Sequence, residues 1–215
     1  MNQNNNLDTS IERLVSLLDL EDIEKNIFRG ESQDIGSPQV FGGQVLGQAL
    51  MAASRTVVDR NVHSLHAYFL RRGDFEAPIV YEVDRARDGG SFSNRRVIAV
   101  QHGEQIFNMT SSFQVPEDGL EHQSAMPNVP PPEELEDLVD LIKPEWIEQL
   151  PLRIRRMLTR ERPFEVKPVE TPHFLINEVK DPIKHSWIRA KGSMSNDIVM
   201  HQALLAYVSD YDLLT

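Results

Sequence analysis

FGGQVLGQALMAASR, residues 41–55, is the stretch that decides the fold expected for this chain. Its apolar side chains recur at steps of one, three and four positions, which is the period of an α-helix: Val45, Leu46, Ala49, Leu50 and Ala53. Glycine and alanine at most of the remaining positions would let other elements approach this helix closely. We therefore expect a central helix buried inside a strongly curved sheet.

The front of this helix carries Gly42 and Gly43. Two glycines let backbone N–H groups come close to a ligand, and the positive end of the helix dipole favours negative charge at the same place. With Gln44, which follows directly, these residues are our candidates for binding a substrate and polarising its carbonyl group. The alternative interpretation is an ordinary turn that leads into a core helix.

The overall composition excludes several classes of function. With 22 basic against 33 acidic residues, the net charge of -11 argues against binding to nucleic acid or to anionic lipid. The chain has no cysteine, which removes disulfides and thiol chemistry, and its first ten residues do not resemble a secretory signal. Residues 35–54 are free of charge but are broken by proline, glycine and glutamine, so they do not predict a membrane span. We expect a cytoplasmic protein.

Metal and nucleotide sites are not indicated either. The seven histidines show no recognised metal spacing. His63 and His66 lie an odd number of residues apart on a predicted strand, so their side chains point to opposite faces. Neither a GxxxxGK loop nor a GxGxxG fingerprint occurs. We expect neither a metal nor another cofactor.

The segments around the central helix predict an α+β domain over residues 1–115. An amphipathic helix is expected at residues 8–20, before the central helix. Strand patterns cover residues 26–32, 63–70, 79–85, 92–101 and 104–115. The last two strands flank His102-Gly103, a two-residue connection that is typical of a tight antiparallel hairpin. A helix followed by such strands predicts an antiparallel sheet that curls around the helix.

The second half of the chain repeats part of this pattern. Residues 116–162 read as a linker, rich in proline at first and followed by short helices at 133–142 and 144–158. From residue 163 two strand patterns, at 164–169 and 184–190, precede a helix from about Asp197. In that helix QALLA repeats the QALMA of the central helix, which indicates an internal duplication. We expect residues 163–215 to hold the start of a second domain, incomplete within this chain.

Several long segments, in order, closely resemble the acyl-coenzyme A thioesterase II family: VFGGQVLGQAL, HSLHAYFLRRGD, RDGGSFSNRRVIAVQHGEQIFNMTSSFQ, FEVKPVE, HSWIRAKG and HQALLAYVSD. The resemblance implies a tandem double hot-dog fold and the hydrolysis of medium- to long-chain acyl-CoA to free fatty acid and CoA. In this family an aspartate, a hydroxyl residue and a glutamine hold the attacking water. Asp210, in YVSD, matches the aspartate. The other two would lie beyond Thr215, so we expect this chain to lack part of the active site.

The chemistry of Asp210 also follows from its surroundings in the sequence. A carboxylate on a largely apolar helix, with Ala203 two turns and Ala206 one turn before it, is partly desolvated. Its pKa should therefore rise into a range that suits a general base. The alternative interpretation is that Asp210 only marks the exit of the helix.

Coenzyme A is strongly anionic, so its phosphates need local arginines on an acidic protein. The candidates are Arg71, Arg72, Arg87, Arg95 and Arg96, of which we select Arg71 and Arg96 as substrate-binding. Arg95 and Arg96 point to opposite faces of their strand, so one ligand would touch only one of them. Each could equally be a solvated charge at a sheet edge. His63 is a candidate polar contact at the border of the site, or a histidine satisfied within its strand.

Two other functions stay open at this point. The chain could be a non-catalytic module that binds acyl thioesters, or a hot-dog hydratase acting on enoyl thioesters. A hydratase would pair an aspartate with a histidine, and no histidine follows Asp210 in this chain. Because hot-dog sheets often pair edge to edge, we also expect a homo-oligomer by analogy.

Overall fold

The computed structural model describes residues 9–148, 150, 152, 155, 159–172, 179 and 181–211. The chain divides into two compact units, each described below by itself. The first combines Met1–Leu14, Leu120–Met194 and Leu214–Thr215, and the second combines Val15–Gly119 with Ser195–Leu213. Over the described part of the chain, no helix is both long and apolar enough to cross a membrane.

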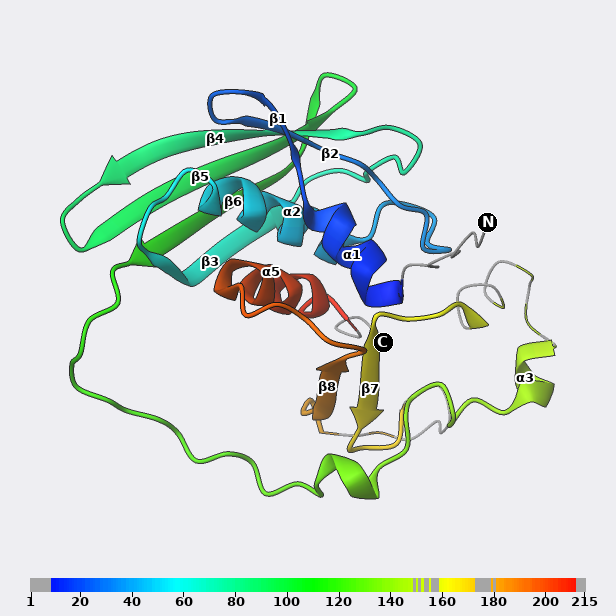
Figure 1. Cartoon of the computed structure of the whole chain (residues 1–215). Helices are drawn as coiled ribbons and strands as arrows, with labels where there is room; N and C mark the ends of the chain where they lie inside the picture. Colours follow the sequence, from blue (N-terminus) through cyan, green and yellow to red (C-terminus); the bar gives the residue numbers. More distant parts are fainter. Residues whose placement is uncertain are drawn as a thin grey trace, which may run out of the picture. The chain divides into compact units, whose positions relative to one another are not determined.

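The second unit is built on a six-stranded antiparallel sheet with the strand order β1-β2-β4-β5-β6-β3 (Figure 1). Its strands are β1 (Glu21–Glu24), β2 (Ile27–Gly30), β3 (Asn61–Phe69), β4 (Ile79–Asp88), β5 (Phe92–Gln101) and β6 (Glu104–Gln114). The five strands predicted from residue alternation are confirmed, and only the short, charged β1 was not expected. Helix α1 (Ser10–Leu18), which confirms the predicted first helix, precedes the sheet.

Helix α2 (Gly42–Ser54) lies along one face of this sheet, and its residues from Gly43 to Ala53 are buried. The sheet presents alternate apolar side chains to it, among them Tyr81 and Phe107, each 0% exposed. The turn between β5 and β6 is the two-residue connection expected, with positive φ at His102 (52°) and Gly103 (77°). The predicted central helix, wrapped by an antiparallel sheet, is therefore confirmed.

Polar side chains hold α2 at its middle. The Gln48 side-chain amide, which is fully buried, donates to the carbonyl oxygens of Leu17 (2.7 Å) and Glu31 (2.9 Å) and accepts from the Tyr81 hydroxyl (2.7 Å). A Cβ placed on Gly30 would lie only 2.7 Å from the Gln48 amide oxygen, so β2 passes close to the helix because it has no side chain there. These contacts fix how far α2 can slide along the sheet.

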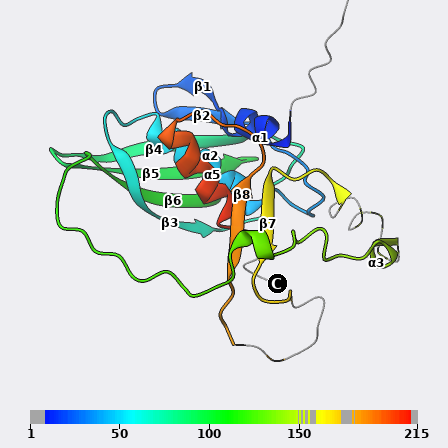
Figure 2. The same cartoon turned by 60° about the horizontal axis from the view of Figure 1, so that its bottom comes forward.

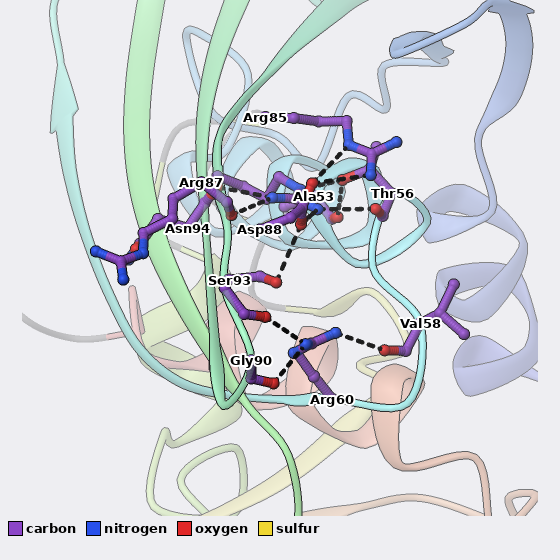
Figure 3. Close-up of polar contacts among 12 residues, drawn as sticks. Ala53, Thr56, Val58, Arg60, Arg85, Arg87, Asp88, Gly90, Ser93 and Asn94 are labelled. Atoms are coloured by element: carbon purple, nitrogen blue, oxygen red, sulfur yellow. Dashed lines mark hydrogen bonds and ion pairs between the residues drawn. The ribbon is translucent and has the colours of Figure 1, made fainter.

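A buried arginine holds the C-terminal end of α2, through partners that include Thr56, Arg87 and Asp88, labelled in Figure 3. Arg95, on β5 and 0% exposed, donates to the hydroxyl and carbonyl oxygens of Thr56 (2.7 and 3.0 Å), just beyond α2. It also donates to the carbonyl oxygens of Arg87 and Asn94 and to the Asp88 carboxylate (2.6 Å). Arg95 and then Arg85, through their hydrogen bonds, hold the pKa of Asp88 well below its usual range. Arg95 is therefore committed to structure and is not available for a phosphate.

Helix α5 (Ile198–Val208) belongs to the same unit and packs along α2 (Figure 2). Its first turn is capped by the Asp197 side chain, which accepts from the Val199 N–H (3.0 Å). A Cβ on Gly47 of α2 would lie 3.2 Å from the Ala203 carbonyl oxygen, so the two helices touch where α2 has no side chain. The predicted second helix is confirmed, and both QALMA and QALLA lie on helices.

The first unit contains the antiparallel hairpin of β7 (Phe164–Pro168) and β8 (Ser186–Ala190), which confirms the two later strand predictions. A proline run packs on this hairpin. The Trp187 indole N–H donates to the Pro130 carbonyl (2.9 Å) and the Lys167 ammonium to that of Pro132 (2.8 Å). Pro131 has φ -66° and ψ 156°, the polyproline II conformation, which leaves backbone carbonyls open to such donors.

The prediction of short helices after the linker is largely wrong. Residues 133–142 form only the 3-10 helix η1 (Pro132–Glu134) and turns, because the Leu138 N–H instead donates to the Val166 carbonyl on β7 (2.7 Å). Helix α3 (Pro144–Glu148) begins where expected, and much of the remainder of 144–158 lies outside the described residues. Residues 116–131 contain neither helix nor strand, as their composition predicts. The domain limits at residues 115 and 163 stay predictions.

Replacing Arg95 with alanine should lower the free energy of unfolding by about 2 to 4 kcal/mol, because buried carbonyl groups around it lose their donors. Arg96 is a matched control, because it is the next residue of β5 but is exposed on the opposite face. Arg96→Ala should change stability by less than about 0.5 kcal/mol. Urea unfolding of both variants measures the difference, and equal effects would contradict the structural role given to Arg95.

Candidate functional site

Asp210 lies just beyond the C-terminal end of α5, where that helix meets the start of α2. Its carboxylate oxygen Oδ2 accepts a hydrogen bond from the backbone N–H of Gly43 (2.9 Å). The two helices run antiparallel, since Gly43 meets Tyr207, whereas Gly47, one turn later on α2, meets Ala203, one turn earlier on α5. The candidate catalytic aspartate and the candidate glycines, which are 167 positions apart in the sequence, are thus brought together.

Two opposing effects act on the Asp210 carboxyl group. Burial, the larger effect, raises its pKa, and the hydrogen bond from the Gly43 N–H acts in the opposite direction. The positive end of the α2 dipole also favours the carboxylate. The rise in pKa expected from the apolar sequence around Asp210 is therefore confirmed, and this half-buried group is suited to accept a proton.

The absence of side chains at Gly42 and Gly43 makes the contact possible. A Cβ on Gly42 would lie 2.6 Å from Asp210 Oδ2 and 3.0 Å from the Phe69 ring. A Cβ on Gly43 would lie 2.1 Å from the Tyr207 carbonyl oxygen, which is backbone and cannot turn aside. Both glycines therefore border Asp210 directly, and Phe69 forms a wall of the same site.

Gln44 does not lie in a position to contact a substrate. Its side chain is 1% exposed, donates to the Glu31 carbonyl (3.2 Å) and accepts from the Gln33 N–H (3.1 Å). One helical turn before Gln48, it fastens α2 to the segment after β2. The prediction of direct substrate contact is corrected on this point, since the side-chain amide is occupied by backbone groups inside the domain.

Beside α5 runs an open groove of about 360 Å³. It is lined by Leu50 of α2, by Val62, His63, Ser64 and Leu65 of β3, and by Gln202, Leu205, Ala206 and Ser209. Ser209, one of these lining residues, directly precedes Asp210 in the chain. At Gln202 the side-chain amide donates to the Val62 carbonyl (3.0 Å), which ties α5 to β3. The groove is mainly apolar, which is the character that a site for an alkyl chain requires.

His63 contributes to the wall of this groove, as a polar contact at the border of the site. Its Nε2 atom lies 2.9 Å from the Ser112 hydroxyl, and its ring packs edge-on against Phe92. Both interpretations made from the sequence are therefore compatible with its position: it borders the groove and it is satisfied by a neighbouring strand.

The two selected arginines differ in position. Arg71 follows β3 two residues after Phe69, near the start of α2, with an exposed guanidinium that contacts Glu104 (3.1 Å) and the Gln105 carbonyl (2.8 Å). Arg96 is exposed on the face of β5 that points away from α2, since its neighbour Arg95 faces inward. The structure therefore keeps Arg71 as a candidate and removes Arg96 from the site at Asp210.

Sequence reasoning missed two parts of the site. The strand pattern over residues 63–70 places Phe69 and Leu65 on the same face of the strand. It does not indicate that the Phe69 ring lies beside Asp210. The groove depends on how β3 and α5 pack, and no local pattern reports a contact between segments so far apart in the chain. Across the residues that the structure describes, no group of three or more histidine, aspartate and glutamate side chains is arranged to hold a metal.

Comparisons with known proteins agree on one family. Residues 29–114 match the model of an acyl-CoA thioesterase N-terminal domain, and residues 155–215 match that of acyl-CoA thioesterase. Acyl-CoA thioesterase 2 of Haemophilus influenzae is 46% identical over 205 residues, which is 94% of this chain and 70% of the relative.

Solved structures extend the comparison. The acyl-CoA thioesterase II TesB2 of Mycobacterium marinum superimposes with a TM-score of 0.69 at 40% identity, over 93% of this chain and 67% of that one. A hot-dog protein from Alicyclobacillus acidocaldarius superimposes with a TM-score of 0.68 at 22% identity, over 92% and 68%, which supports the fold alone. The chain thus spans about two thirds of the length of each of these proteins. The predicted hot-dog fold is confirmed.

Replacing Gly43 with alanine should force α5 away from α2 and break the hydrogen bond to Asp210, because the new methyl group meets a backbone carbonyl. We expect a loss of about 2 kcal/mol or more in the free energy of unfolding, as is usual for overpacking. Gly90→Ala is the control, since a Cβ there meets nothing within 4 Å. Thermal unfolding of the two variants tests this, and a stable Gly43→Ala protein would contradict the close helix contact.

Proposed function

The chain belongs to the acyl-CoA thioesterase II family of hydrolases, and we propose that the site at Asp210 hydrolyses acyl-CoA to a free fatty acid and CoA. The observation that carries the proposal is the hydrogen bond between the Asp210 carboxylate and the Gly43 N–H at the start of α2. A proton acceptor lies there beside the positive end of the α2 dipole, and acyl transfer to water requires both a base and stabilisation of the developing negative charge.

In the proposed reaction a water molecule attacks the carbonyl carbon of the thioester while Asp210 accepts one of its protons. The carbonyl oxygen gains negative charge, which the positive end of the α2 dipole stabilises. Collapse of the tetrahedral intermediate breaks the C–S bond. The thiolate of CoA leaves, takes up the proton held by Asp210, and the carboxylate is restored.

The groove beside α5 is the proposed site of the acyl chain. Ser209, which lines it, directly precedes Asp210 in the chain. Leu65 and Leu205 also line it, and contacts between these side chains and the methylene groups of the acyl chain would replace contacts with water. A groove of this kind suits medium to long acyl chains. Arg71, near the start of α2, is the proposed contact for a phosphate of CoA.

The membership of the family makes a non-catalytic binding module the less favoured alternative. The hydratase alternative differs in its product, because only hydrolysis releases a free thiol. The cytoplasmic location and the homo-oligomer expected from the sequence stay predictions.

In a protein that also carries the hydroxyl residue and the glutamine expected of the family, changing Asp210 to asparagine should lower kcat by at least about a hundredfold with little change in KM, because general-base assistance is of that size. The carboxyl group is active only when ionised, so activity should fall as the pH drops through its pKa. Because burial raises that pKa, the acid limb should lie above the usual range of an aspartate. A thiol-release assay across pH measures both effects.

Asp197→Asn serves as the control, since this aspartate caps the start of α5 and is far along that helix from the site. It should keep the acid limb and most of kcat, because asparagine also caps helices. Near-normal turnover of Asp210→Asn would rule out the assigned base.

Replacing Leu205 with tryptophan should fill the groove and shift the preference toward shorter acyl chains. We expect kcat/KM for a long-chain acyl-CoA to fall at least about tenfold relative to a short-chain one, because several methylene groups lose their binding site. Ile198→Trp is the matched control, since Ile198 is exposed on the same helix but does not line the groove. If both variants keep the original preference, the acyl chain binds elsewhere.

A further inference from the structure

Three aromatic rings lie together at the end of α5: those of Phe41, Tyr207 and Tyr211. The ring of Phe41, the residue just before α2, lies 5.0 Å from the Tyr207 ring and 5.4 Å from the Tyr211 ring, measured between centroids. The two tyrosine rings lie 5.9 Å apart. All three pairs are tilted or edge-on, the arrangement in which aromatic rings attract one another. We call these three residues the aromatic clamp.

The aromatic clamp joins the two segments that build the site. Phe41 directly precedes the glycines of α2, whereas Tyr211 directly follows Asp210 and Tyr207 lies almost one turn before it. A Cβ on Gly43 would lie 2.4 Å from the Phe41 ring as well as 2.1 Å from the Tyr207 carbonyl oxygen. The Phe41 ring therefore occupies the space that a side chain on Gly43 would fill, and it lies between the start of α2 and the end of α5.

We propose that Phe41 is a positioning residue of the active site: its ring, packed on Tyr207 and Tyr211, holds the Asp210 carboxylate at the Gly43 N–H and keeps water from one side of it. The inference rests on the proposed function of Asp210. Phe41 itself touches neither the water nor the thioester in this scheme. It acts by fixing the end of α5, because a displacement of about 1 Å in a catalytic group can lower a rate about a hundredfold.

The groups that face Asp210 are largely uncharged. Gly42 and Gly43 of α2 and Phe69 of β3 carry no titratable side chain, and the first turn of α2 contains no acidic residue. Among the described residues of its own segment, the titratable neighbours are the phenols of Tyr207 and Tyr211, and a phenol ordinarily ionises far above the range of a carboxyl group. A change in the titration of Asp210 would therefore report its hydration and its hydrogen bond.

The test compares Phe41→Ala with Phe41→Tyr. In Phe41→Ala we expect kcat to fall about tenfold to a hundredfold with KM within about twofold. The acid limb should move to lower pH, because the missing ring admits water and burial is the larger cause of the raised pKa of Asp210. This effect outweighs a weakened hydrogen bond from the Gly43 N–H, which by itself would raise the pKa. Phe41→Tyr keeps the ring and should restore both kcat and the acid limb. Tyr68→Ala, which removes an exposed ring of β3, should change neither.

A second measurement separates this proposal from the assignment of the base. The titration of the Asp210 carboxyl carbon, followed by NMR in the folded protein, does not depend on turnover. A downward shift in Phe41→Ala supports the aromatic clamp even if Asp210→Asn were to remain active. An unchanged titration would overturn the proposal, and so would a fall in kcat without any movement of the acid limb, because that result indicates only a loss of stability. If Phe41→Ala does not fold, Phe41→Leu is measured in its place, with the same outcomes.

Discussion

The close approach of α2 and α5 is the constraint on which the rest of the site depends. Backbone of α5 reaches backbone of α2 because Gly43 and Gly47 lack side chains, one helical turn apart. That approach brings the Asp210 carboxylate within 2.9 Å of the Gly43 N–H. A single methyl group in this contact would separate the Asp210 carboxylate from the Gly43 N–H, so the packing of the helices and the geometry of the candidate site cannot be changed independently.

The sheet supplies the rigid frame for this contact. Gln44 and Gln48 tie the first half of α2 to the segment after β2, and Arg95 ties its far end to β5. Each of these side chains is almost fully buried and hydrogen-bonded, which is the condition under which buried polar groups favour one arrangement of the elements. The start of α2 is thus held in place before any ligand arrives.

Much of the fold could be predicted because its signals are local. In β4 and β6 the alternation of apolar and polar residues is visible within each strand, without knowledge of its neighbours. The turn at His102-Gly103 requires only two residues that adopt positive φ. Strand β1 was missed because its four exposed residues carry no apolar alternation. The helix expected over residues 133–142 failed because a backbone contact with β7 replaced its hydrogen bonds.

The site was predicted in part for the same reason. The family resemblance and the apolar helix indicated Asp210, and the glycines indicated the start of α2, but no pattern joined the two. Alternation showed that Arg95 and Arg96 face opposite ways without showing which one is buried. Only packing decides that, as it decides the position of Phe69 and the presence of a groove.

The position of the Asp210 carboxylate also bears on how a product would leave. A thioester is neutral at its reacting carbonyl, whereas the fatty acid formed from it carries a second carboxylate beside Asp210. In a half-buried site two such charges repel each other more strongly than in water. Both would also compete for the same Gly43 N–H. A site of this construction therefore admits its substrate and expels its product, and turnover need not be limited by a slow release step.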